Sequence, residues 1–285
     1  MSLQDWYLRL INSRYKELII VSLVIFLIAF GSVMYNYIVN GKFFELSTEI
    51  TGGYLIILPS KASLQDLNAL LSKINVSDYS IYEVGGNFYI EARDINSDLL
   101  IQELNAIGIS EREISIQRFS SYVGGIIFNQ LSLLLIISTL IISFLIWVRF
   151  RERRSVIGII SVILWDMFIT LALINLVKLR VGPVGLVTLI GILGFAIDNN
   201  IVLSTNVYQE KDLSFDDRIK MSLKVGLLME LFVVLVVIPL YLLIDLPIIK
   251  EFSLIWLFIV LADSYAYLFF NVPLYRYFEE ISKHQ

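Results

Sequence analysis

The chain has 285 residues, of which 57% are hydrophobic and 17% charged, and its formal net charge is −4. Soluble domains are nearer ~45–50% apolar and ~25% charged, so the composition excludes an ordinary soluble enzyme. Long apolar runs recur along the chain and predict a polytopic α-helical membrane protein.

The first predicted element is a membrane helix over Leu18–Ile38, which follows a more polar segment, residues 1–17. Its apolar stretch of about 21 residues exceeds the ~7–15 residues of a signal-peptide core, and no A-x-A cleavage site closes it. We therefore expect an uncleaved membrane anchor.

Residues 39–122 have the composition of a soluble domain, with eleven Asp plus Glu and six Lys plus Arg. Their apolar spacing predicts the order β-α-β-β-α-β, which is that of a ferredoxin-like α+β sandwich. Ser63 and Asp66 fit a capping box at the start of the first helix. The predicted elements are an extended segment over Phe43–Leu58, a helix over Leu64–Ile74, strands over Tyr79–Val84 and Phe88–Arg93, a helix over Ser97–Ile107 and a strand over Glu113–Phe119.

Residues 123–275 contain five further apolar stretches of the ~17–25 residues that a bilayer requires. We predict membrane helices over Val123–Val148, Ser155–Val177, Val184–Val207, Ser222–Ile244 and Ser253–Tyr275, followed by a tail, residues 276–285. Lys and Arg concentrate before the first helix, at 149–154 and at 211–224. By the positive-inside rule, both termini are cytoplasmic and residues 39–122 lie outside the plasma membrane.

The residue inventory excludes several kinds of chemistry. Cysteine is absent, and the single histidine, His284, is next to the last residue, where we expect it to be solvated. No G-x-x-x-x-G-K-[ST] phosphate loop occurs. We therefore expect no cofactor, no bound metal, no nucleic-acid partner and no enzymatic activity.

Four carboxylates lie inside the predicted spans at similar depth: Asp166, Asp198, Glu230 and Asp263. An ionised acid at the centre of a membrane helix costs ~2.5–3.5 kcal/mol, so four would rival the ~5–15 kcal/mol stability of a whole domain. No Lys or Arg of the sequence lies at their depth. We expect one proton-relay centre whose acids are protonated, paired with a partner's cation or turned to a hydrated interior. The alternative is that each acid only hydrogen-bonds a neighbouring helix.

The fourth span carries small residues beside one of these acids. At about 100° per residue, Gly191, Gly194 and Asp198 share one face of the helix, where the glycines predict close packing by another helix. Thr170 and Tyr267 lie one turn from Asp166 and Asp263, and either relay a proton or simply pack.

Two stretches stand out: the run over Gly194–Leu203 in the fourth span, and Glu49-Ile50-Thr51-Gly52-Gly53 near the start of the predicted domain. The first resembles the fourth-helix signature of SecF, the accessory subunit of the Sec translocase, in its archaeal form. The second resembles the Asp-Phe-Thr-Gly-Gly motif that opens the external domain of that family. Further matches lie in the third and sixth spans: Trp165-Asp166 with Ala172–Leu176, and Leu261-Ala262-Asp263. The resemblance covers essentially the whole chain.

Some positions depart from the family pattern. Glu49 stands where the family usually has Asp, and Asn200 where archaeal members commonly have a second acid. Bacterial members carry their acid one position after Asp198, at the site of Asn199. Any proton site in this helix must then be Asp198 alone, while Glu230 matches no acid associated with the family.

The resemblance implies a SecD-like partner subunit, a place beside a SecY-type channel in the lipid bilayer, an exported unfolded polypeptide and the use of proton motive force. Two alternatives stay open. One is a small proton-coupled exporter of the resistance-nodulation-division type, a class whose membrane bundle has twice the six spans predicted here. The other is a passive scaffold of the channel.

Overall fold

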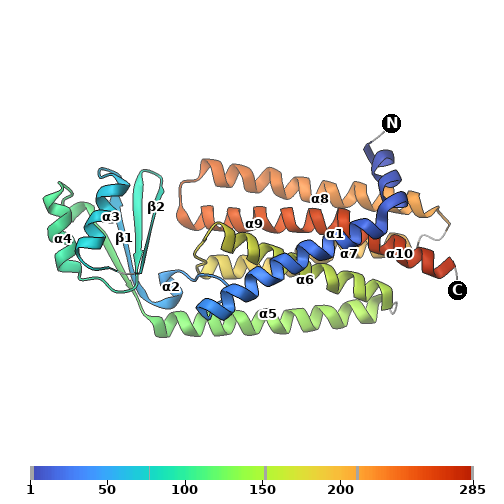
Figure 1. Cartoon of the computed structure of the whole chain (residues 1–285), viewed down its shortest axis with the longest axis horizontal. Helices are drawn as coiled ribbons and strands as arrows, with labels where there is room; N and C mark the ends of the chain where they lie inside the picture. Colours follow the sequence, from blue (N-terminus) through green and yellow to red (C-terminus); the bar gives the residue numbers. More distant parts are fainter. Residues whose placement is uncertain (1–2, 77, 151–152, 210–211, 284–285) are drawn as a thin grey trace.

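The computed structural model describes residues 3–76, 78–150, 153–209 and 212–283, so His284 lies outside the described part of the chain. The molecule consists of a long helical bundle with a small sheet domain at one end, and both termini lie at the other end (Figure 1). We use "sheet domain" for Gly53–Phe119.

Six helices in the described ranges are long and apolar enough to cross a membrane, and each predicted span overlaps one of them. They are α1 (Leu3–Asn40), α5 (Ser121–Phe150), α6 (Arg153–Leu176), α7 (Pro183–Gln209), α8 (Phe215–Leu243) and a last helix made of α9 (Pro247–Tyr265), a π-helical segment (Ala266–Asn271) and α10 (Val272–Lys283). The fold is therefore mostly helical, as the composition predicts.

The first helix begins much earlier than its apolar stretch. Residues from Leu3 onward are helical, with a kink where Arg14 has φ −133° and ψ 20°. Tyr7, Leu8 and Ile11 are buried against residues of α8 and α10. The polar N-terminal segment is thus a short amphipathic helix, because its apolar side chains recur at helical spacing, and it packs against the bundle with its apolar face.

The sheet domain contains β1 (Gly53–Pro59), α3 (Leu64–Lys73), β2 (Tyr79–Val84), β3 (Asn87–Ala92), α4 (Ser97–Ala106), a 3-10 turn (Glu111–Glu113) and β4 (Ser115–Phe119). The strands lie in the order β2-β3-β1-β4, and all neighbours are antiparallel. Ile56 pairs with Ile90 on one side and Ile116 on the other. The capping box of Ser63 and Asp66 is present at the start of α3.

The two helices of this domain cover one face of the sheet (Figure 1). Leu67 and Leu71 of α3 and Leu100 of α4 pack with Ile56 and Ile90 in one buried core. The alternating pattern of the strands turns the next residues, such as Glu91, to the opposite face, which lies toward the bundle.

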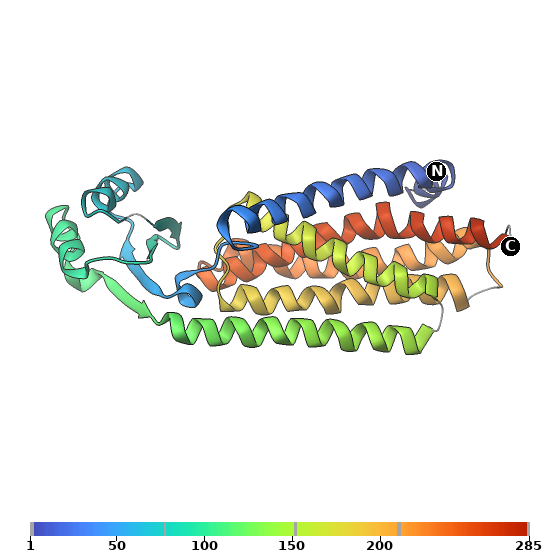
Figure 2. The ribbon, with the colours of Figure 1, turned by 60° about the horizontal axis from the view of Figure 1, so that its bottom comes forward.

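The expectation of one extended segment over Phe43–Leu58 is wrong in its first half. A short helix, α2 (Thr48–Thr51), interrupts it before β1 begins. Gly52 and Gly53, with φ of +81° and +138°, turn the chain from α2 into the strand, a backbone path that suits glycine. The helix lies against the start of α5, which follows β4 almost directly (Figure 2).

Candidate functional site

Three of the four intramembrane acids meet in the middle of the bundle. Asp166 of α6, Glu230 of α8 and Asp263 of α9 are almost completely buried and close enough to interact electrostatically. We call these three residues the acid cluster. It lies where α6, α7, α8 and α9 pack against one another.

A buried amide from α7 holds two of these carboxylates. Asn199 Nδ2 lies 2.7 Å from Asp263 Oδ2 and 3.3 Å from Glu230 Oε1, and donates to both. The hydroxyl of Ser264 donates to the other oxygen of Glu230. Asn199 is not titratable, yet it is the residue through which α7 contacts the cluster.

Asp166 is the least satisfied member of the cluster. Neither of its carboxylate oxygens has a conventional donor among the described residues, although the carboxyl of Asp263 lies within hydrogen-bonding reach. Two carboxylates this close in a buried site do not both ionise, and a proton on one of them supplies a hydrogen bond to the other. The arrangement is suited to holding a proton between α6 and α9.

No lysine or arginine in the described ranges forms an ion pair with a member of the cluster. Thr170 and Tyr267, the predicted neighbours, are fully buried, and their hydroxyls have no hydrogen-bond partner within the described residues. Buried hydroxyls normally have a hydrogen-bond partner. Each of these two hydroxyls is therefore suited to bind a bridging water or to pass on a proton.

Polar side chains continue from the cluster toward the end that holds both termini. Asn271 donates to Asn200, and one turn further Ser204 hydrogen-bonds Tyr275. All four residues are buried. Sequence analysis did not single out Asn271, Ser204 or Tyr275; the available signal was their polarity inside otherwise apolar membrane helices.

Asp198 lies apart from the acid cluster, which corrects the expectation of one four-acid centre. It is exposed in this chain and lines a groove of about 380 Å³ between α5 and α7, together with Gly194 and Arg149. Successive residues of a helix point about 100° apart, and it is Asn199 that faces α8 and α9. The side chain of Asp198 is therefore turned out of the bundle core.

The two glycines of the α7 stripe have different surroundings. A methyl group on Gly191 would lie 3.2 Å from the indole of Trp256 in α9, so this position is closely packed. A methyl group on Gly194 would meet none of the described residues within 4 Å. The predicted helix–helix contact exists at Gly191, whereas Gly194 lies in the open groove beside Asp198.

The EITGG motif forms the joint between the sheet domain and the bundle. A side chain on Gly52 would lie 2.7 Å from the backbone nitrogen of Ser121, and one on Gly53 2.5 Å from the carbonyl of Ala92. The hydroxyl of Thr51 donates to the carbonyl of Ser47 at 3.1 Å, within the turn of α2. The two glycines therefore let the backbone of the motif pack directly against the backbone of Ser121 and of Ala92.

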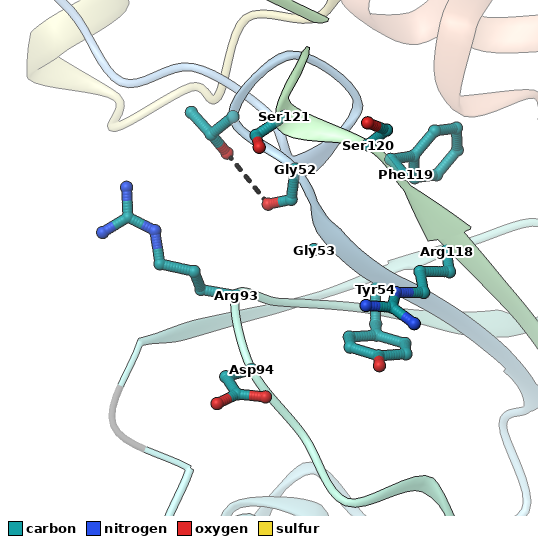
Figure 3. Close-up of a pocket in the computed structure, with 10 residues that line it drawn as sticks. Gly52, Gly53, Tyr54, Arg93, Asp94, Arg118, Phe119, Ser120 and Ser121 are labelled. Carbon is teal, nitrogen blue, oxygen red and sulfur yellow. Dashed lines mark hydrogen bonds between the residues drawn. The ribbon is translucent and has the colours of Figure 1, made fainter. Parts of the chain in front are cut away.

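A pocket of about 590 Å³ opens beside this joint (Figure 3). Gly52 and Gly53 form part of its wall, together with Arg93, just after β3, and Arg118 of β4. The guanidinium of Arg118 lies over the ring of Tyr54, 5.7 Å from its centre. The pocket is broad and polar, and it lies well away from the acid cluster.

Glu49, the acid of the motif, faces a second cleft of about 510 Å³ between the sheet and the bundle. Partial burial and the nearby carboxylate of Glu91 raise the pKa of Glu49 above its ordinary value of 4.5. Glu91 is itself buried and accepts hydrogen bonds from the Thr48 backbone at 3.1 Å and the Tyr82 hydroxyl at 3.2 Å. The same surroundings raise the pKa of Tyr82.

Arg180, in the loop between α6 and α7, lines this cleft together with Lys178 and Lys250. It lies 3.2 Å from Asp78 and 3.8 Å from Glu91, both in the sheet domain. Beside it the Val181 backbone exchanges two hydrogen bonds with Glu45 and Ser47. Arg180 therefore links the sheet domain to the bundle, and sequence analysis did not single it out.

Comparison with known proteins adds the family. The model of the family "Protein export membrane protein SecD/SecF, C-terminal" matches residues 100–281. The chain belongs to the SecF family. Among its curated relatives, the protein-export membrane protein SecF of Pyrococcus furiosus is 24% identical over 256 residues, covering 87% of this chain and 86% of that one. The SecF of Methanocaldococcus jannaschii is 23% identical over 197 residues, covering 65% and 68%.

Solved structures of SecDF have the same fold as this SecF-family chain. The crystal structure of SecDF from Thermus thermophilus, a translocon-associated membrane protein, superposes with a TM-score of 0.76 at 16% identity and covers 98% of this chain. A second SecDF structure, in a super-membrane-facing form, gives a TM-score of 0.60 at 16% identity and covers 96% of it. The chain spans only about 40% of the length of the first solved protein and 39% of the second.

Proposed function

We propose that this SecF-family chain is a non-enzymatic accessory subunit of the Sec translocase that uses proton motive force to promote export of unfolded polypeptides. A relative that is named for protein export and matches 87% of this chain supports the role in export. We also propose that it works with a SecD-like subunit beside a SecY-type channel. The length of the SecDF structures supports this partner, because each is long enough for a second unit of similar size.

The acid cluster is the observation that carries the use of proton motive force. Asp166 and Asp263 are fully buried and within reach of each other, and no described basic residue pairs with them. A shared proton between α6 and α9 makes the contact of these helices depend on protonation. One elementary charge moved through 100 mV is worth about 2.3 kcal/mol, which is enough to shift a two-state equilibrium about fiftyfold.

The sheet domain is the proposed contact for the exported chain. Its element order and its strand order, β2-β3-β1-β4, support a ferredoxin-like topology. Both termini lie at the opposite end of the bundle, next to the basic loops, which supports cytoplasmic termini and an external sheet domain. Any tilt of the bundle would be transmitted through the joint formed by α2, Arg180 and the start of α5.

The exposed faces of α5 and α7 are the proposed contact surface for the SecD-like subunit. Asp198 and Gly194 line the groove between these helices, and no atom of the described residues lies within 4 Å of where a methyl group on Gly194 would be. An acid turned toward lipid costs ~2.5–3.5 kcal/mol when ionised, so a covering helix with a polar partner would relieve that cost. Asp198 then acts at the interface and Asp166 and Asp263 act inside the bundle.

Export by vesicles that contain the channel, a SecD-like subunit and this chain tests the proposal. Asp166→Asn and Asp263→Asn should each abolish the response of export to a proton gradient while the proteins still co-purify. If the double amide variant exports with an unchanged gradient response, the chain is a scaffold. Asp198→Asn is the matched variant, and it should weaken co-purification with the SecD-like subunit instead.

A further inference from the structure

A separate pocket lies at the end of the bundle that holds both termini. It has a volume of about 330 Å³ and is lined by the start of α6, the end of α7, the start of α8 and α10. Helix ends lie at the level of the membrane surface, where lipid headgroups are found. The acid cluster and the joint of the sheet domain do not contribute to this pocket.

Two arginines from different helices line the pocket. Arg154 of α6 donates to the carbonyl of Phe278 at 3.3 Å. Arg218 of α8 is only 9% exposed, and one of its terminal nitrogens donates to the carbonyl of Val207. The Nε of Arg218 is buried and has no hydrogen-bond partner in the described part of the chain. A buried guanidinium whose donors are not all satisfied favours an anion close by.

A third guanidinium adds to the positive charge. Arg218 and Arg276 both lie over the ring of Phe215, 5.6 and 5.1 Å from its centre. Of the acids in the described ranges, Glu279 lines the pocket, and its carboxylate is 3.8 Å from Arg218. Other nearby acids have partners elsewhere, since Asp216 accepts from Asn12, Asp217 from Ser214 and Glu280 from Tyr15. Among the described residues that line the pocket, two arginines therefore lie beside one acid.

We propose that this pocket binds a phosphate group, held by Arg154 and Arg218. Guanidinium groups match the geometry of phosphate oxygens and are weakly hydrated, so they suit a half-buried anion site. The aromatic side chains of Tyr275 and Phe278 in the wall give the rest of the ligand an apolar surface. The phosphate belongs either to an anionic lipid of the adjoining leaflet or to a free anion, and the two sources give different results below.

The test is native mass spectrometry of the delipidated full chain titrated with phosphatidylglycerol. The wild-type chain should bind one lipid more tightly than the rest. Arg154→Gln should weaken that first binding about fivefold, the effect of one basic residue at a membrane surface. Glu279→Gln removes the competing carboxylate and should tighten it. Lys224→Gln, which removes an exposed charge two turns along α8 from Arg218, is the matched control and should change nothing.

Inorganic phosphate at millimolar concentration distinguishes the sources. If it displaces the tight lipid and appears as an adduct, the ligand is the free anion; if the lipid stays bound, the ligand is the headgroup. Equal lipid binding by wild type and Arg154→Gln overturns the proposal. So does a loss of lipid binding in Lys224→Gln as large as that in Arg154→Gln, because it would indicate that diffuse surface charge binds the lipid. The Tm of each variant identifies loss of binding through misfolding, and Glu279→Gln still tests the site if Arg154→Gln misfolds.

Discussion

Asn199 of α7 donates a 2.7 Å hydrogen bond to Asp263 of α9 in the middle of the bundle. Its amide also reaches Glu230 of α8, so one uncharged side chain ties three helices together. Its neighbour Asp198, the acid of the family signature, is turned to the groove beside α5 instead. Of these two consecutive residues, Asn199 therefore faces the core of the bundle and Asp198 faces its outer surface.

Asn199→Ala should destabilise the chain by about 1–3 kcal/mol, because two buried carboxylates lose a donor. Equilibrium unfolding in mixed micelles measures this change. Asn206→Ala is the matched control on the same helix, where the amide makes one hydrogen bond to Ser222 at 3.0 Å, and it should cost less than about 1 kcal/mol. Equal costs for the two variants would show that Asn199 does not hold the acids.

Gly124→Ala should loosen the joint between α2 and α5. A methyl group at this position would lie 2.0 Å from the carbonyl oxygen of Ile50, so the backbones must separate, at a cost of about 1–3 kcal/mol. A methyl group on the next residue, Gly125, would meet nothing within 4 Å, and Gly125→Ala should stabilise the helix by up to about 1 kcal/mol. Thermal unfolding of the two variants measures this difference. If Gly124→Ala and Gly125→Ala shift Tm in the same direction, close packing of α2 on Gly124 does not explain the result.

Arg180→Gln should free the sheet domain from the bundle. The variant leaves buried Glu91 without its cation and breaks the contact with Asp78, which should cost about 1–3 kcal/mol. Hydrogen exchange at the amides of Ser47 and Val181 should become faster, since these amides join the segment before α2 to the loop that carries Arg180. Lys61→Gln removes only an exposed pair with Glu113 and should leave this exchange unchanged.

Glu49→Gln should change how stability depends on pH. The folded chain holds the proton of Glu49 above pH 4.5, where the unfolded chain loses it, so this residue makes stability fall as pH rises from 4.5 through its raised pKa. The variant removes that fall and should be more stable than wild type at neutral pH by less than about 1 kcal/mol, since the side chain is partly solvated. Below pH 4.5 the two proteins should have equal Tm; a difference that is the same at every pH would refute this account.

The helices and the order of the sheet domain were predictable because they depend on local patterns. Apolar length identifies the spans, and the capping box of Ser63 and Asp66 marks the start of α3 in four consecutive residues. The short helix over Thr48–Thr51 was missed, because its position depends on contact with α5, more than seventy residues later in the chain.

The contacts between acids were only partly predictable. Depth along each span shows that Asp166, Glu230 and Asp263 lie at one level, but which face of each helix turns inward depends on the packing of all six. A difference of about 100° separates Asp198 from Asn199 and decides which of them meets the cluster. Arg180 and Glu91 come from different parts of the fold, and their meeting follows from tertiary structure alone.

The π-helical segment over Ala266–Asn271 changes the direction in which side chains on either side of it point around the axis of the last helix. Asp263 and Tyr275 are twelve positions apart, which on a regular α-helix would place them about 120° from each other. One wide turn takes up an extra residue and reduces the difference to about 20°. Both side chains can then reach α7, where Asp263 meets Asn199 and Tyr275 meets Ser204. Deleting one residue from this segment should rotate one of the two contacts away while the helix remains continuous.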